Sequence, residues 1–240
     1  MSSSVRWSKA PQFRVQKKSC RAALDWTDED ICLYVVRAEV RRPNMPNEVE
    51  IKFRVDDVRG LKQRLRASGF REETRRTHES NTLYDLPGRA LLKKGELLRL
   101  RKYGTSWLLT YKAKGKIARH KTRLEIQTRI DDGKQFEKIL QALGYVPSFL
   151  YEKFRAEWSD GKGHVVLDET PIGFFGEIEG PARWIDSTAR RLEIDRESYL
   201  TDSYAGLFHA WKLRTRSQAK DMTFRAVRGS KHSRNFPGTT

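Results

Sequence analysis

Cysteine is scarce in this chain of 240 residues, which has only Cys20 and Cys32, both near the N-terminus. Two cysteines so placed offer neither a disulfide framework nor a zinc site. Long apolar runs are absent as well: no stretch reaches the 18 or so residues that a membrane helix needs. The N-terminus also lacks the basic and then apolar pattern of a secretory signal. We therefore expect a reducing, cytoplasmic setting and no membrane partner.

Several catalytic motifs are also missing. There is no glycine-rich Walker loop, and Gly161-Lys162-Gly163 is typical of a hairpin turn between two strands. No serine or cysteine has a recognisable set of partners for nucleophilic catalysis. Structural roles are favoured for the histidines, because none shows metal-ligand spacing; they are His78, His120, His164, His209 and His232. These absences exclude P-loop, zinc and covalent catalysis as leading interpretations.

Positive charge is abundant, with a formal net charge of +17 that invites a nucleic-acid interpretation. Its distribution weakens that interpretation. Residues 1–44 carry +4 and residues 213–240 carry +6, which leaves +7 for residues 45–212. More than half of the excess therefore lies in the two ends. The central part mixes both signs, as expected of an enzyme that handles a polyanion through metals.

The two ends differ from the centre in pattern as well as charge. Residues 1–44 show no sustained period, and a regular strand pattern begins at Met45. Either residues 1–44 are an over-extended reading frame or they form a disordered arm, and both remain open. The tail over 213–240 is basic, rich in serine and glycine, and predicted to be disordered. The expected domain thus covers residues 45–212.

Alternation of polar and apolar residues predicts eight strands, at residues 48–56, 82–86, 97–103, 107–114, 119–130, 150–159, 164–169 and 175–180. Connections between them are mostly short, as at residues 103–106, which favours antiparallel pairing. Apolar residues at helical spacing predict four helices, two of them before Gly69 and Gly144 and two over residues 184–192 and 204–211. The expected fold class is α+β, with an antiparallel sheet and flanking helices.

Charged residues follow one face of the first strand. In the segment Glu48–Phe53 the side chains of Glu48, Glu50 and Lys52 share a face, and the apolar ones share the other. For a single strand, a solvated sheet face would explain this. The same alternation recurs in residues 98–101, 107–114, 123–127, 153–157, 166–168 and 177–179. Because helices must cover the apolar face, the charged face points inward if the sheet closes, and it then lines a polar cavity.

Such a cavity requires a ligand. Like charges about 4 Å apart repel by roughly 4 kcal/mol at an effective dielectric constant near 20, so protons or divalent cations must offset the repulsion. The candidate metal ligands are Glu48, Glu50, Asp168, Glu177 and Glu179, with Glu125 as a further candidate. Oxygen-only ligands favour Mg²⁺ or Mn²⁺. The cations suit a multi-phosphate anion; they are Lys52, Arg99, Arg101, Lys112, Lys114, Arg123, Lys153 and Arg155.

The opening run Glu48-Val49-Glu50-Ile51-Lys52 resembles the Glu-x-Glu-x-Lys signature of the CYTH superfamily, the triphosphate tunnel metalloenzymes. Further motifs resemble that family in order: Thr82-Leu83-Tyr84-Asp85, Arg99-Leu100-Arg101, Lys112-Ala113-Lys114, Arg123-Leu124-Glu125, Glu152-Lys153-Phe154-Arg155, Val166-Leu167-Asp168 and Glu177-Ile178-Glu179. The resemblance covers residues 45–212. It implies an eight-stranded antiparallel barrel that forms a tunnel, with the acids on metal and the cations on triphosphate. Gln127 stands where many members have a second acid, which puts Glu125 in doubt as a ligand.

The resemblance is greatest to the class IV adenylyl cyclases, through residues 144–147, 152–155 and 161–164 and through His78 and Glu79. It implies conversion of ATP to cyclic AMP and pyrophosphate. The first alternative is a triphosphatase for inorganic tripolyphosphate, thiamine triphosphate or a nucleoside triphosphate. A non-catalytic binder of RNA or another polyanion is the second, although nucleic acid is not the expected partner. The sequence names no general base and leaves a homodimer open.

Overall fold

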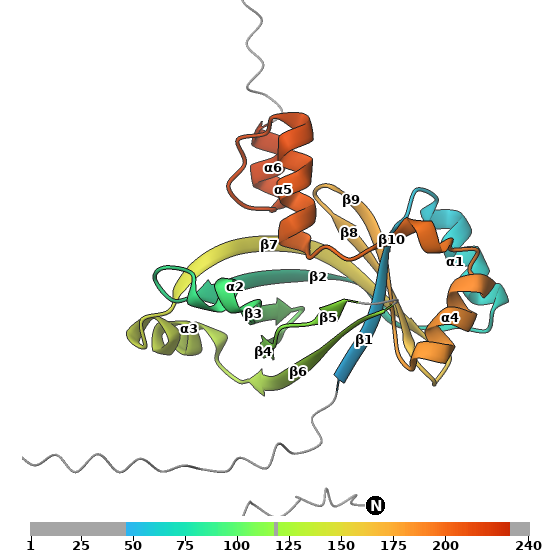
Figure 1. The fold of residues 1–240 in the computed structure, drawn as a ribbon, viewed down its shortest axis with the longest axis horizontal. Helices are drawn as coiled ribbons and strands as arrows, with labels where there is room; N and C mark the ends of the chain where they lie inside the picture. The colour runs from blue at the N-terminus through green and yellow to red at the C-terminus, as the bar shows by residue number, and fades with distance from the viewer. Residues whose placement is uncertain (1–46, 118–119, 231–240) are drawn as a thin grey trace, which may run out of the picture. The chain divides into compact units, whose positions relative to one another are not determined.

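The structure, a computed structural model, describes residues 47–117 and 120–230 of the chain (Figure 1). The segment 1–44, with its two alternative interpretations, lies outside the described residues. Among the residues described, no helix combines the length and the apolar character needed to cross a membrane.

Eight antiparallel strands close into a barrel. Around the barrel they are β1 (Asn47–Arg54), β9 (Gly173–Glu179), β8 (His164–Thr170), β7 (Val146–Ser159), β2 (Arg71–Asp85), β3 (Leu97–Tyr103), β4 (Ser106–Lys112) and β6 (Lys121–Ile130). β6 pairs with β1, where Arg123 lies opposite Glu48, and this pairing closes the sheet. Two short strands, β5 (Lys116–Ile117) and β10 (Tyr199–Leu200), pair with β6 and β1. The predicted fold class is confirmed.

The longest strands differ most from their predicted extents. β2 begins at Arg71, whereas the sequence predicted a start at residue 82, and β7 begins at Val146 instead of residue 150. The first part of β2 carries polar side chains on both faces, so it shows no apolar alternation. Pairing with β7 nevertheless continues to its beginning, where Arg71 lies opposite Ser159.

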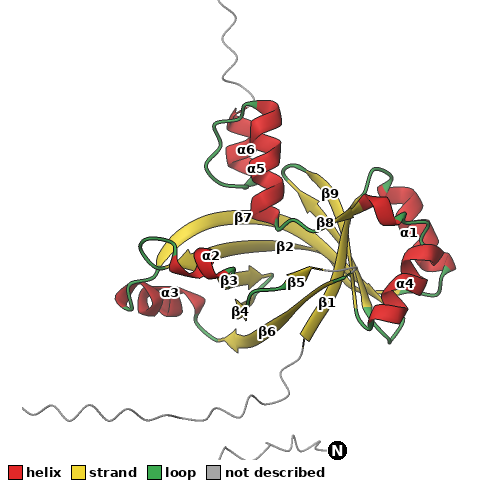
Figure 2. Ribbon diagram, in the orientation of Figure 1, coloured by secondary structure: helices red, strands yellow, loops and turns green. Residues whose placement is uncertain are grey.

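Two helices cover the outer face of β1, β9 and β8 (Figure 2). α1 (Val58–Ala67) begins after Asp57, whose carboxylate accepts a hydrogen bond of 2.8 Å from the Gly60 amide. α4 (Ala182–Arg191) begins after Pro181. Their apolar faces pack with the outward side chains of the strands in one core, which includes Ile51, Phe53, Leu61, Leu65, Val165, Ile178, Ile185 and Ala189. Burial of these faces leaves the opposite, charged face of the strands to the interior of the barrel.

A smaller core lies under α3 (Gly133–Ala142), where Leu140 packs against Tyr84 of β2 and Leu100 of β3. Asp132 caps this helix by accepting a hydrogen bond of 3.0 Å from the Gln135 amide. α2 (Ala90–Lys94), a single short turn after β2, was not predicted. The helices α1, α3, α4 and α5 lie where the sequence predicted them.

The predicted disordered tail is wrong for residues 213–230. α5 (Tyr204–Thr215) is followed by α6 (Phe224–Ser230), and the two lie side by side beyond β7 (Figure 1). Met222 and Val227 are buried in a core with Phe208 and Trp211. The backbone of Met222 also bonds to β7: its amide donates to Leu150 and its carbonyl accepts from Glu152, both at 3.0 Å. These few apolar residues fix the segment although its composition is basic; residues 231–240 lie outside the described part.

Candidate active site

A cavity of about 970 Å³ lies inside the barrel, and all eight barrel strands contribute to its wall. Its lining is rich in charged side chains of both signs, as expected if the polar faces of the strands turn inward. The first turn of α5 adds Tyr204 and Ala205 to the wall. The cavity therefore gathers charges from distant parts of the sequence.

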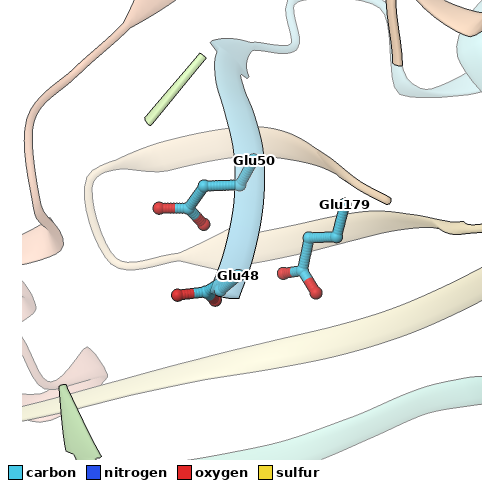
Figure 3. Close-up of side chains that lie close together, drawn as sticks. All are labelled: Glu48, Glu50 and Glu179. Carbon is cyan, nitrogen blue, oxygen red and sulfur yellow. The ribbon is translucent and has the colours of Figure 1, made fainter. Parts of the chain in front are cut away.

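Three glutamates form one cluster in this wall, which we call the acid trio: Glu48, Glu50 and Glu179 (Figure 3). One carboxylate oxygen of each lies within 4.8 Å of those of the other two. β1 and β9 are neighbours with Glu50 opposite Glu179, so the register brings the acids together. The acid trio joins three of the predicted metal ligands.

Positive charge is unevenly distributed over the acid trio. Lys112 Nζ and Arg123 Nε lie 2.6 and 3.4 Å from Glu48, and Lys121 Nζ lies 2.7 Å from Glu50. Within the described residues, Glu179 has no ion-pair partner. Burial, together with the charges of Glu177, Glu48 and Glu50, raises the pKa of Glu179 to about 7. An unpartnered carboxylate beside two others, all with oxygen donors, fits a hard divalent cation such as Mg²⁺ or Mn²⁺.

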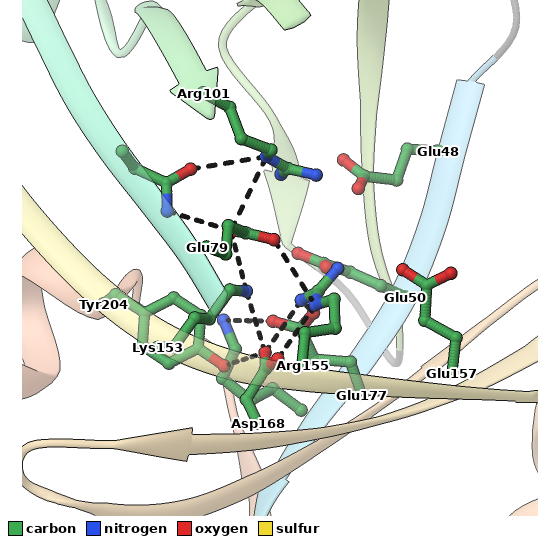
Figure 4. A network of polar contacts seen from close by, with 12 residues as sticks. Glu48, Glu50, Glu79, Arg101, Lys153, Arg155, Glu157, Asp168, Glu177 and Tyr204 are labelled. Atoms are coloured by element: carbon green, nitrogen blue, oxygen red, sulfur yellow. Dashed lines mark hydrogen bonds and ion pairs between the residues drawn. The ribbon is translucent and has the colours of Figure 1, made fainter. Parts of the chain in front are cut away.

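Two other predicted ligands, Asp168 and Glu177, belong to a separate group. We call it the buried ionic network, and it consists of Glu79, Lys153, Arg155, Asp168 and Glu177 (Figure 4). The carboxylate of Asp168 is fully buried and accepts from Lys153 at 2.8 Å and from Arg155 at 2.7 and 2.8 Å. Asp168 also accepts a hydrogen bond of 2.6 Å from the Tyr204 hydroxyl.

Glu177 is held just as firmly. Arg155 lies 2.5 Å from its carboxylate and Lys52 lies 3.1 Å away. Burial alone would raise the pKa of Glu177, but Lys52 and Arg155 lower it well below the ordinary value. The five acids predicted as one ligand set are thus divided in the structure. Three form the acid trio, and the other two belong to the buried ionic network.

Glu79 of β2 is a buried site residue that the sequence analysis named for its family resemblance but did not include among the candidate ligands. Its carboxylate lies 3.4 Å from Lys153 and 3.5 Å from Arg101, and it accepts a hydrogen bond of 2.9 Å from the Asn81 side-chain amide. Burial opposes ionisation, but Lys153, Arg101 and Arg155 lower the pKa of Glu79 far below its ordinary value. The run that precedes Glu79 is polar on both faces, so the sequence pattern does not show that the Glu79 side chain points inward. The resemblance of this residue to family sequences was the only signal available.

The predicted triphosphate-binding cations line the cavity with one exception. The lining includes Lys52, Arg99, Arg101, Lys112, Arg123, Lys153 and Arg155. Lys114 follows the end of β4, is exposed, and does not line the cavity. Arg99 is buried, yet its Nε has no hydrogen-bond partner among the described residues. A buried donor left without an acceptor is costly, and an anionic ligand would satisfy it.

Glu125 and Gln127 lie on β6 and also line the cavity. Glu125 is 2.8 Å from Lys112 and 3.9 Å from Arg99, and it lies outside the acid trio. The side-chain oxygen of Gln127 accepts a hydrogen bond of 3.1 Å from the Thr110 hydroxyl. Glu125 therefore links cations of the wall in this structure.

Comparison with known proteins relates this geometry to a family. The family described as "CYTH domain" matches residues 46–204. A protein of Methanocaldococcus jannaschii named "Putative adenylate cyclase" is 26% identical over 147 residues, which are 61% of this chain and 83% of that protein. Among solved structures, the PH1819 protein of Pyrococcus horikoshii is 26% identical with a TM-score of 0.58, over 68% of this chain and 98% of its own. A "putative adenylate cyclase" of Vibrio parahaemolyticus, 23% identical, shares the fold with a TM-score of 0.61, over 68% of this chain and 97% of its own.

Proposed function

The chain belongs to the CYTH domain family, and from that premise we propose that it is a divalent-metal enzyme that cleaves a triphosphate, with ATP as the leading substrate. The observation that carries the proposal is the acid trio, whose Glu179 has no ion-pair partner among the described residues, in a cavity wall that is also rich in Lys and Arg. Groups that can bind a metal and groups that can bind phosphate thus line one cavity.

The acid trio would hold the metal, which supplies positive charge and polarises a phosphate oxygen when bound. Mg²⁺ and Mn²⁺ both suit the oxygen donors. Asp168, Glu177 and Glu125 stay predicted ligands, and each would have to leave cations that it contacts now. Glu48 and Glu50 also contact cations, so the metal assignment rests mainly on the grouping of the acid trio around Glu179, which has no ion-pair partner among the described residues.

The cations of the wall would bind the phosphates. Arg99 and Arg101 present guanidinium groups from adjacent positions of one face of β3, and such groups can bind phosphate oxygens bidentately. From β7, Arg155 adds a third guanidinium group and Lys153 a single ammonium charge, and the buried ionic network fixes their direction. Because their counter-ions hold them in place, little reorganisation is needed when the substrate enters.

ATP cyclisation is the leading reaction. In it the ribose 3′-hydroxyl attacks the α-phosphorus and pyrophosphate leaves. Support comes from the resemblance to class IV cyclases and from the printed name of the M. jannaschii relative. A cytoplasmic setting remains a prediction.

A triphosphatase is the second candidate, in which water attacks the terminal phosphorus. The composition of the cavity favours it, because charged side chains dominate the wall and apolar residues such as Leu83 and Leu97 are few. A wall of this kind holds a polyphosphate without contacts to a base. The two candidates differ in which phosphorus reacts, so their products distinguish them.

The test is incubation of the full chain with Mn²⁺ and either ATP or inorganic tripolyphosphate, with the products separated by ion-exchange chromatography. Cyclic AMP with pyrophosphate is the result expected of a cyclase. Orthophosphate without cyclic AMP identifies a triphosphatase. If none of these products forms from either substrate, the proposed function is wrong.

A further inference from the structure

Two buried tyrosines lie side by side in the cavity wall, and their hydroxyl groups differ. The rings of Tyr151 and Tyr204 stack with centroids 5.8 Å apart. The Tyr204 hydroxyl donates a hydrogen bond of 2.6 Å to Asp168. The Tyr151 hydroxyl instead accepts a hydrogen bond of 3.2 Å from Arg99 Nη1, and its own proton has no acceptor in the described part of the chain. Of these two tyrosines, only Tyr151 therefore has a hydroxyl proton available to a ligand in the cavity.

The charged groups that act on Tyr151 lie on β2, β3 and its own strand, β7. Arg99 and Arg101 face it from β3 and Lys153 from its own strand, while Glu79 on β2 opposes them. Tyr204 of α5 covers its ring, and Asp221 bonds the backbone of the preceding residue at 3.0 Å. Burial acts to raise the pKa of Tyr151, but Arg99 and Lys153 outweigh it and lower the pKa below the ordinary value.

Tyr204 shows that the stacking itself does not have this effect. Burial and the neighbouring charge of Asp168 raise the pKa of Tyr204 well above its ordinary value. The pKa values of the two stacked phenols thus differ because Tyr204 faces a carboxylate and Tyr151 faces cations.

Contacts connect Tyr151 to the acid trio across the cavity wall. Arg99, which donates to Tyr151, lies 3.9 Å from Glu125. Glu125 lies 2.8 Å from Lys112, and Lys112 lies 2.6 Å from Glu48. The tyrosine and the acid trio are therefore two ends of one series of polar contacts along the surface where the phosphates would lie.

We propose that Tyr151 is a catalytic residue whose hydroxyl gives its proton to the bridging oxygen that leaves when the triphosphate is cleaved. This role rests on the proposed function and deepens it. It supplies a proton donor that the sequence alone did not identify.

The step balances without a further reactant. The attacking oxygen, from water or from a ribose hydroxyl, forms a bond to phosphorus, and the bond from phosphorus to the bridging oxygen breaks. The electron pair stays on the bridging oxygen, which takes the Tyr151 proton. Arg99 and Lys153 stabilise the phenolate that remains. The proton released by the attacking oxygen passes to solvent, and solvent reprotonates Tyr151 after the products leave.

The position of the hydroxyl is well fixed. The Tyr151 ring stacks on Phe149 with centroids 5.7 Å apart, and the backbone on both sides is bonded to Met222. Phenylalanine at this position keeps the ring and its packing and removes only the hydroxyl. Tyr84→Phe is the matched control, because Tyr84 is equally buried but donates to Glu137 at 2.7 Å and does not line the cavity.

The experiment measures kcat and KM against pH for the full chain with Mn²⁺ and the triphosphate that the wild type cleaves. We expect Tyr151→Phe to lower kcat about 100-fold, within the usual range for loss of a general acid, with little change in KM. The alkaline decline of kcat in the wild type should disappear in this variant. Tyr84→Phe should keep both the rate and the decline.

Tyrosinate absorbance of the metal-free protein gives a second readout. One tyrosine of the wild type should ionise at lower pH than the rest, and Tyr151→Phe should lose that transition. If the wild type cleaves triphosphate and Tyr151→Phe keeps its kcat, the role of Tyr151 is refuted and the proposed function stands. If the wild type cleaves none, both are refuted.

Discussion

Glu177 and Glu179 are two residues apart on β9, and both side chains face the cavity, yet their environments are opposite. The pKa of Glu177 lies well below its ordinary value because Lys52 and Arg155 outweigh the effect of burial. The pKa of Glu179 rises to about 7 because burial and three neighbouring acids act together. Glu177 belongs to the buried ionic network, and Glu179 is the member of the acid trio without an ion-pair partner in the described part of the chain. Alternation along a strand directs an acid inward, but the cations on neighbouring strands decide whether it is available to a metal.

Loss of an acid from the acid trio is expected to have the largest effect. Glu179→Gln should lower metal-dependent turnover at least about 100-fold, since even residues that only orient a metal ligand cost up to that much. It should also abolish the rise in melting temperature that Mn²⁺ produces, because the binding energy is lost. Differential scanning fluorimetry with and without Mn²⁺, alongside the activity assay, checks this. Glu197→Gln, at an exposed position, is the control and should change neither quantity.

For the same variant, Glu179→Gln, we also predict how the stability of the metal-free protein depends on pH. The pKa of Glu179 in the folded protein, about 7, is above the ordinary carboxyl value of about 4.3 in the unfolded chain. The folded state therefore binds more protons, and this group lowers stability as pH rises from about 4 to 7. Metal-free Glu179→Gln should gain in melting temperature relative to the wild type between pH 5 and pH 8. If the difference in melting temperature between the variant and the wild type were the same at pH 5 and at pH 8, the environment assigned to Glu179 would be wrong.

Loss of an acid from the buried ionic network should act on folding itself. Asp168→Asn leaves Lys153 and Arg155 without a full counter-charge in the interior, which should cost about 3–5 kcal/mol in the free energy of unfolding. Urea denaturation of the metal-free protein measures it. The neighbouring Glu169→Gln breaks a largely exposed pair with Arg76 and should cost less than about 1 kcal/mol. Equal losses in the two variants would remove the distinction between the two groups.

A smaller effect is expected at Lys121, which lies 2.7 Å from Glu50 and competes with a metal for it. Lys121→Gln should tighten Mn²⁺ binding about fivefold, equivalent to about 1 kcal/mol, because it removes a cation that competes for Glu50. Titration calorimetry with Mn²⁺ measures this, with Lys134→Gln on the exposed face of α3 as control. Weaker binding in Lys121→Gln would show that the lysine supports the site.

The smallest effect is expected at Lys114, because it is exposed and does not line the cavity. Lys114→Gln should change KM for the triphosphate by less than about twofold, in the range of an exposed charge. Lys112→Gln, two residues earlier on the cavity wall, should raise KM far more. Steady-state kinetics of both variants under one set of conditions makes the comparison. A large effect at Lys114 would mean that it moves into the cavity when substrate binds.

Alternation was sufficient to predict most strands and the common face of Glu48, Glu50 and Lys52, because a period of two fixes the face of each side chain. Closure of the sheet into a barrel was predicted from the family resemblance. It could not predict which acids pair with which cations. That depends on register between strands such as β1 and β9, which the residues of one strand do not determine. Asp168 and Glu179 therefore looked alike in the sequence although they lie in different groups.

The missed parts have a common cause. Glu79 follows a polar run with no apolar face, and Met222 and Val227 are isolated apolar residues in a basic segment. Each is placed by partners far along the chain, Lys153 for Glu79 and β7 for Met222. Local composition does not indicate such distant partners, so the prediction of disorder was wrong for residues 213–230.

Closure of the barrel by β1 has a consequence for folding kinetics. β1 pairs with β6, where Glu48 and Arg123 are 75 residues apart, and with β9, much further along the chain. Contacts at such separations are slow to form, because much chain entropy is lost before they are made. The acid trio exists only once β1 has paired with β9, so a metal that needs all three acids recognises the closed barrel alone. Mn²⁺ should therefore slow the unfolding rate and leave the refolding rate nearly unchanged.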